Sequence, residues 1–102
     1  MKTSEIKFTV TFDDNNVPEK IQWSGPESKG ENFTKALMVS FWDAQERNSL
    51  RLDLWTKKMM VDEMMLFYHQ SLHSMADAFE RATGKAGAAA AMRDLADHLS
   101  EK

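Results

Sequence analysis

Two histidines, His69 and His73, stand four residues apart in the segment HQSLH. On a helix this spacing places both imidazoles on one side, and Asp77 continues the row after one further turn. Two imidazoles and a carboxylate are ligands that several divalent metal ions accept. The segment lacks the glutamate that acts as general base in the H-E-x-x-H motif. We therefore interpret both histidines as flank residues of a helix and expect no catalytic metal there.

The remaining segments carry no catalytic signature. Cysteine is absent, which excludes disulfides, thiolate zinc sites and thiol nucleophiles. The segment DDNN begins like a calcium loop but has no glycine at the sixth position and no glutamate at the twelfth. GPESKG lacks the spacing of a phosphate-binding loop. We expect a protein that is not an enzyme and that needs no cofactor.

Composition and charge exclude further classes of function. The net charge of −3 gives little electrostatic support for binding to nucleic acid, and the only basic cluster is Lys57-Lys58. No apolar run approaches the roughly 20 residues of a membrane span, and the N-terminus does not resemble a signal peptide. With 102 residues, 42% of them hydrophobic, the chain fits one globular domain over 1–102. We expect a cytoplasmic location.

The first half of the chain reads as four strands. Apolar and polar residues alternate with the period of two that is typical of strands. The predicted strands cover about 4–12, 17–23, 33–43 and 50–56. In the third strand both faces are apolar, and in the fourth Leu50, Leu52 and Leu54 face inward.

The period then changes to that of a helix. Apolar residues from Val61 to Ala82, with Phe79 near the centre, fall in one stripe that predicts a helix over 60–83. Gly84 suits its C-cap, and an alanine-rich second helix is expected over 87–99. This order predicts an α+β fold, in which a four-stranded antiparallel meander is followed by two helices packed on one face of the sheet.

Large apolar side chains outside the expected core define a candidate interaction surface. Leu37, Val39 and Phe41, with Trp55 beside them, are expected on the sheet face that points away from the helices. Leu66 and Phe67 lie outside the helix stripe. A homo-oligomer, first of all a dimer, would cover such a surface. The alternative is that the loop 24–32 covers it.

Five segments carry a resemblance to a known family: SEIKFTV, VPEKIQW, LRLDLWTK, VDEM and FYHQSLHSMADAFERAT. Over about residues 3–84 the chain resembles the gliding-motility protein GldC family of Bacteroidetes-type bacteria. It departs from the family pattern at Met60, where that pattern has proline at the first helical position.

The resemblance implies a small cytoplasmic accessory or assembly protein, without catalytic residues, that contacts a protein of the gliding or secretion machinery. The strand order is also similar to that of the export chaperone SecB. The alternative function is therefore a chaperone that binds unfolded export clients, an analogy at the level of the fold alone.

Overall fold

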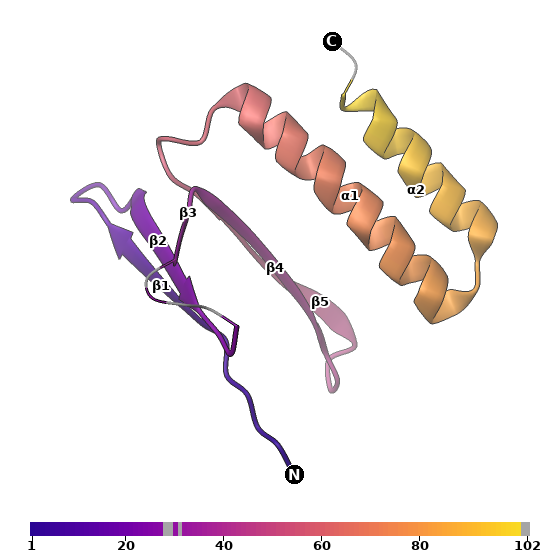
Figure 1. Cartoon of the computed structure of the whole chain (residues 1–102), viewed down its shortest axis with the longest axis horizontal. Coiled ribbons are helices and arrows are strands. Elements are labelled where there is room, and N and C mark those ends of the chain that lie inside the picture. Colours follow the sequence, from indigo (N-terminus) through magenta and orange to yellow (C-terminus); the bar gives the residue numbers. More distant parts are fainter. Residues whose placement is uncertain (28–29, 31, 101–102) are drawn as a thin grey trace. The chain divides into compact units, whose positions relative to one another are not determined.

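The computed structural model of the chain describes residues 1–27, 30 and 32–100 (Figure 1). Two compact units follow one another along the sequence, Met1–Met59 and Met60–Lys102. In the described part of the chain the first unit contains strands only, and the second contains helices only. The α+β class is confirmed, whereas the single domain over 1–102 stays a prediction.

Three strands form the first sheet, in the order β1-β2-β3 with antiparallel neighbours. They are β1 (Lys7–Phe12), β2 (Pro18–Ser24) and β3 (Asn32–Thr34). Val10 lies opposite Ile21 and Phe8 opposite Trp23, so the apolar residues of the two alternating patterns share one face. The alternation of the sequence therefore predicts the faces of this pair correctly, although β1 begins at Lys7 and not at residue 4.

Two strands form the second sheet, β4 (Ala36–Asp43) and β5 (Asn48–Trp55), which pair as an antiparallel hairpin. An aspartate organises the turn. The carboxylate of Asp43 accepts hydrogen bonds from the backbone N–H groups of Gln45 and Glu46, each at 2.9 Å. Arg47 adopts a left-handed conformation with φ 56°. The turn before β2 uses the same chemistry, because Asp13 accepts from the backbone of Asn15 and Val17.

The predicted strand 33–43 is in fact two strands, because the chain bends at Lys35. The Thr34 hydroxyl donates to the carbonyl of Ala36 at 2.8 Å, which stabilises the bend. The carbonyl of Lys35 accepts from both the backbone N–H (2.8 Å) and the hydroxyl (3.1 Å) of the buried Thr56. The predicted four-stranded meander is therefore wrong. The described residues form a three-stranded and a two-stranded sheet, and the fold analogy with SecB loses its basis.

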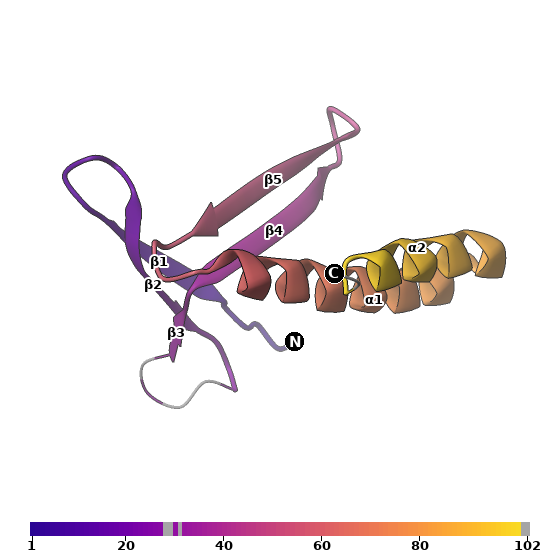
Figure 2. The same cartoon turned by 90° about the horizontal axis from the view of Figure 1, so that it is seen from above.

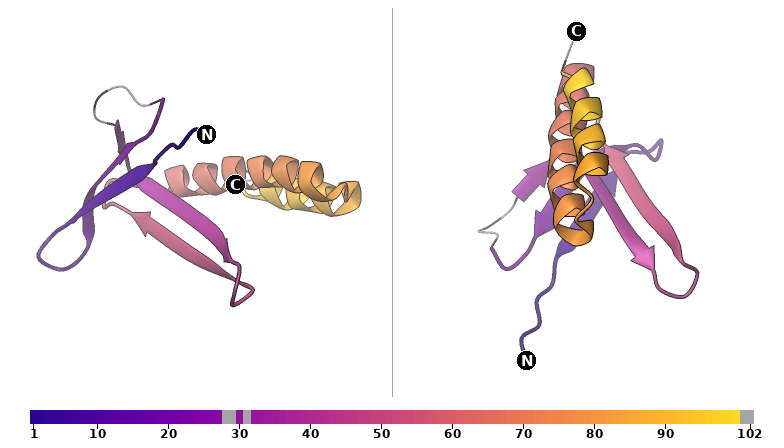
Figure 3. Two further views of the ribbon diagram at one scale, coloured as in Figure 1. Left: turned by 90° about the horizontal axis from the view of Figure 1, so that it is seen from below. Right: turned by 90° about the vertical axis from the view of Figure 1, so that its right-hand side faces the viewer.

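The second unit is a pair of helices, α1 (Val61–Thr83) and α2 (Ala86–His98), and it confirms the predicted bounds to within a residue. The Glu63 side chain accepts from the backbone N–H of Met60 at 3.2 Å, so Met60 is the N-cap and not the first helical residue. Gly84 ends α1 with φ 72° and donates to the carbonyl of Glu80 at 2.8 Å. The helices run antiparallel, side by side (Figures 2 and 3).

Few apolar side chains are buried in the described residues. They are Ile21, Ala36, Leu37, Ala76, Ala89 and Ala96. In the part of the chain that the structure describes, Ile21 is the only large side chain that is fully buried, and the buried residues of the helices are alanines. Packing of the helices on one face of the sheet stays a prediction. Three residues of the loop 24–32 (28, 29 and 31) lie outside the described residues, so its role as a cover is untested.

Candidate functional site

The β4–β5 hairpin carries an uninterrupted apolar face. Residues directly opposite each other in an antiparallel pair have their side chains on the same side of the sheet. Three such pairs follow one another along the hairpin, and we call them the apolar ladder. They are Leu37 with Leu54, Val39 with Leu52, and Phe41 with Leu50. Because none of the six carries a charge, the ladder suits contact with another apolar surface.

Exposure of the apolar ladder rises toward the turn. Leu37 is buried, and Val39 and Leu54 are half-buried. Leu50, Leu52 and Phe41 are 42%, 47% and 56% exposed. The outer two thirds of the ladder therefore need a cover if the apolar surface is to leave water.

The expected distribution of these residues over two faces is wrong. Leu50, Leu52 and Leu54 were expected inward, with Leu37, Val39 and Phe41 outward, yet the register places both sets on one face. The expectation failed because alternation within one strand does not say which residues of its neighbour share a face; only the register does.

Trp55 does not belong to the apolar ladder. It lies opposite Ala36, on the other face of the hairpin. That face is mixed in character. The guanidinium of Arg51 binds the carboxylate of Asp53 at 2.8 Å, and Trp42 lies opposite Ser49. We therefore remove Trp55 from the candidate surface that contains the ladder.

Leu66 and Phe67, the other predicted surface residues, belong to the helical unit. Leu66 is 54% exposed. Phe67 is half-buried and meets Tyr68 edge to face, with ring centroids 6.2 Å apart. These two residues and the ladder belong to different units, so their membership in one surface stays a prediction.

The two histidines lie at the contact between α1 and α2. His69 Nδ1 is 2.7 Å from the backbone carbonyl of Ala96, and His73 Nε2 is 2.8 Å from Asp97 Oδ1. The two rings meet edge to face, with centroids 4.9 Å apart. The third group of the cluster is thus Asp97, from the other helix, and not the predicted Asp77. Ligand atoms of His69, His73 and Asp97 all lie within 4.8 Å of one another.

Asp77 has a different partner. Arg93 of α2 donates to the Asp77 carboxylate at 2.8 Å and to Glu80 at 2.9 Å. The hydrogen bond from Arg93 lowers the pKa of Asp77 below its usual range.

The sequence reasoning missed Asp97 because it followed the row of side chains along a single helix. The helix spacing of Arg93, Ala96 and Asp97 was the available signal for a face turned toward α1.

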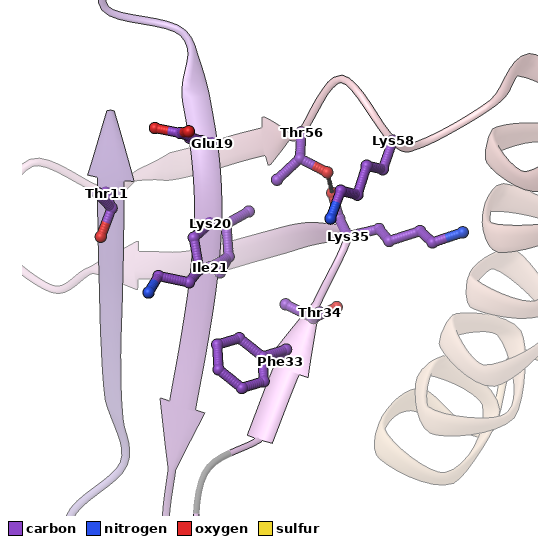
Figure 4. Close-up of a pocket in the computed structure, with 9 residues that line it drawn as sticks. All are labelled: Thr11, Glu19, Lys20, Ile21, Phe33, Thr34, Lys35, Thr56 and Lys58. Carbon is purple, nitrogen blue, oxygen red and sulfur yellow. Dashed lines mark hydrogen bonds between the residues drawn. The ribbon is translucent and has the colours of Figure 1, made fainter. Parts of the chain in front are cut away.

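An open pocket of about 730 Å³ lies in the strand unit (Figure 4). Its wall is partly apolar, from Ile21 and Phe33, and the Lys20 amine lies 5.9 Å from the centre of the Phe33 ring. In Figure 4 the amines of Lys20 and Lys35 point in opposite directions. The amines of Lys20 and Lys35 therefore do not converge on one point in the pocket.

No helix in the described part of the chain is both long and apolar enough to cross a bilayer.

A family model described as gliding motility-associated protein GldC-like matches residues 18–102. The match includes both helices, and the segment SEIKFTV at the start of the chain lies outside it. No curated protein and no solved structure matches the chain significantly.

Proposed function

The chain belongs to the GldC-like family of gliding motility-associated proteins, and we propose that it works there without catalysis, as a cytoplasmic accessory or assembly protein. The family has no known catalytic role. In this chain, the working surface is the apolar ladder of the β4–β5 hairpin, which mediates contacts between proteins. We further propose that the first contact is between two copies of this chain, and that the resulting dimer contacts the gliding or secretion machinery.

The exposed apolar ladder is the observation that carries this proposal. A two-stranded hairpin is at best marginally stable in water, and it needs packing on its apolar face. Phe41, Leu50 and Leu52 are each more than two-fifths exposed. A neighbouring surface that covers them stabilises the hairpin and removes a patch that would otherwise favour aggregation.

A second copy of the chain suits the apolar ladder because the ladder is self-complementary. A two-fold interface places the same patch of both subunits in contact, and an uncharged patch does so without repulsion. The ladder has three exposed side chains, fewer than a standard stable interface of about 800 Å² per partner requires. We therefore expect a dimer that forms at tens of micromolar and dissociates on dilution.

Sedimentation equilibrium of wild type, Phe41→Asp and Trp42→Asp tests the proposal. Phe41 and Trp42 are adjacent, lie on opposite faces of the hairpin and are 56% and 63% exposed, which makes Trp42 a matched control. We expect wild type and Trp42→Asp to exceed the 11.7 kDa mass of the monomer, and Phe41→Asp to stay at that mass with an unchanged circular dichroism spectrum. Leu50→Asp gives a second probe if Phe41→Asp does not fold.

Two results contradict the proposal: a wild-type mass of 11.7 kDa at tens of micromolar, or equal dissociation of both variants. The alternative function is the binding of unfolded export clients. Adding a reduced, unfolded model protein to the solution distinguishes this function from that of an assembly protein. Suppression of that protein's aggregation by wild type, lost in Phe41→Asp, favours the chaperone. A lack of effect, together with the dimer, favours the assembly protein.

A further inference from the structure

We propose that the helical unit binds a divalent transition-metal ion, with zinc as the leading candidate, at His69, His73 and Asp97. The three side chains come from both helices, and one ligand atom of each lies within 4.8 Å of the others. The ion would link α1 to α2, a structural role that is separate from the protein contact proposed for the apolar ladder.

His69 is already held as a metal ligand requires. A carbonyl oxygen accepts hydrogen bonds only, so the 2.7 Å contact with Ala96 means that His69 Nδ1 carries the hydrogen. The lone pair of the neutral ring is then on Nε2. Histidines that bind metals typically donate their other N–H to a carbonyl or carboxylate in this way, which fixes the tautomer and the ring orientation.

His73 and Asp97 supply the second and third ligands. The 2.8 Å contact between His73 Nε2 and Asp97 Oδ1 holds one hydrogen between an imidazole nitrogen and a carboxylate. A metal ion bound there would displace that hydrogen from Nε2 to solvent, and Nδ1 would take up a hydrogen from solvent in exchange. Neutral His73 then carries its hydrogen on Nδ1, so no net proton is gained or lost at this ring.

The geometry requires a modest closure of the side chains. Zinc–nitrogen and zinc–oxygen bonds of about 2.0–2.2 Å in a tetrahedron place neighbouring ligand atoms roughly 3.4 Å apart. The present upper limit on these separations, taken over one ring nitrogen of each histidine and one Asp97 oxygen, is 4.8 Å. His69 and His73 are half-buried and Asp97 is exposed, so side-chain rotation can close the difference.

The donor set selects the class of ion. Two imidazoles and one carboxylate favour zinc, copper, nickel or cobalt, whereas magnesium and calcium prefer oxygen ligands alone. Three protein ligands leave a fourth position for water. Among the described residues of the two helices the fully buried apolar side chains are alanines, so a bond through the ion adds to a unit with little apolar burial of its own.

The test uses full-length protein without a histidine tag, freed of metal with a chelator. Equilibrium dialysis with elemental analysis measures zinc binding, and circular dichroism at 222 nm measures the melting temperature. We expect one zinc per chain and a rise in melting temperature that EDTA reverses. We expect no effect from magnesium.

Two variants address the ligands separately. Asp97→Asn keeps an oxygen that accepts from His73 but removes the carboxylate, so it should weaken zinc binding at least about 10-fold with little change in the metal-free melting temperature. His69→Ala should also weaken zinc binding, and because it removes the hydrogen bond to the Ala96 carbonyl, its metal-free melting temperature should fall. His98→Gln is the control, because His98 follows Asp97 directly but lies outside the cluster, and it should bind zinc as wild type does.

The proposal is overturned if wild type takes up no stoichiometric zinc, or if Asp97→Asn and His69→Ala both bind as tightly as wild type. Equal loss in His98→Gln would also overturn it, because binding would then follow histidine content and not this geometry.

Discussion

At the scale of single residues, the side chain of Asp13 connects two distant parts of the strand unit. Lys57, which follows β5, lies 2.9 Å from its carboxylate. The hydrogen bond from Lys57 lowers the pKa of Asp13 to about 2, and backbone donors in the turn add to the effect. The same contact raises the pKa of Lys57. Both pKa shifts mean that the folded chain favours the charged forms of Asp13 and Lys57.

We expect Lys57→Met to lower thermal stability at neutral pH and to lose that difference in acid. The folded pKa of Asp13 lies below the unfolded value of about 3.9. Its stabilisation is therefore complete above about pH 4 and is lost as the pH falls toward about 2. Melting curves of wild type and Lys57→Met between pH 7 and pH 2 measure the difference.

Lys58→Met is the control for this experiment, since it removes a charge of the same sign from the next position. A difference between wild type and Lys57→Met that stays constant from pH 7 to pH 2 would show that the ion pair does not act on stability.

At the scale of elements, glycines define the end of α1 and a weak point at the start of α2. Gly84 has φ 72°, a conformation that side-chain-bearing residues rarely adopt, whereas Gly87 lies inside α2 without a positive φ. A Cβ atom added at either position meets nothing within 4 Å. The two glycines therefore differ in backbone conformation and not in available space.

We expect alanine substitutions at these glycines to act in opposite directions. Gly84→Ala forces a left-handed alanine and should lower the free energy of unfolding by about 1–2 kcal/mol. Gly87→Ala should raise it by about 0.5–1 kcal/mol, because alanine loses less conformational freedom in a helix. Urea denaturation followed by circular dichroism measures both. The same sign for both variants would contradict the assignment of Gly84 as the C-cap.

At the scale of the whole molecule, neither unit has a large hydrophobic core of its own among the described residues. Along α1 the predicted stripe remains partly exposed: Val61 is 78%, Tyr68 39% and Met75 49% exposed. Helix α2 meets α1 at the two histidines, which border that stripe. The larger stripe residues are therefore available for a further contact.

We expect the full chain to unfold in one cooperative transition, as the predicted packing of the stripe on the sheet requires. In that predicted packing, burial shared between the strands and the helices would couple them, so that neither would melt first. Differential scanning calorimetry at a fixed protein concentration measures this, through equality of the calorimetric and van't Hoff enthalpies. Two resolved transitions, one with the far-ultraviolet signal of helix alone, would show two independent units.

Local features were decided by the sequence alone. The 3.6-residue period and Gly84 predict the helix bounds closely, because periodicity and left-handed glycine act within a few residues of chain. The alternating faces of β1 and β2 and the turn at Asp13 follow from equally local rules. The family could also be recognised from the sequence, because the resemblance rests on short segments of consecutive residues.

Features that depend on pairing between distant segments came only from the tertiary structure. The bend at Lys35 is held by the local bond from Thr34 to Ala36 and also by hydrogen bonds from Thr56, which lies outside 33–43. The apolar ladder depends on the register of β4 against β5, and the histidine cluster on Asp97 from a second helix. Thr56 is 21 residues from Lys35 and Asp97 is 24 residues from His73. Even within the hairpin, the pairing of the two strands and not the local pattern chooses which side chains meet.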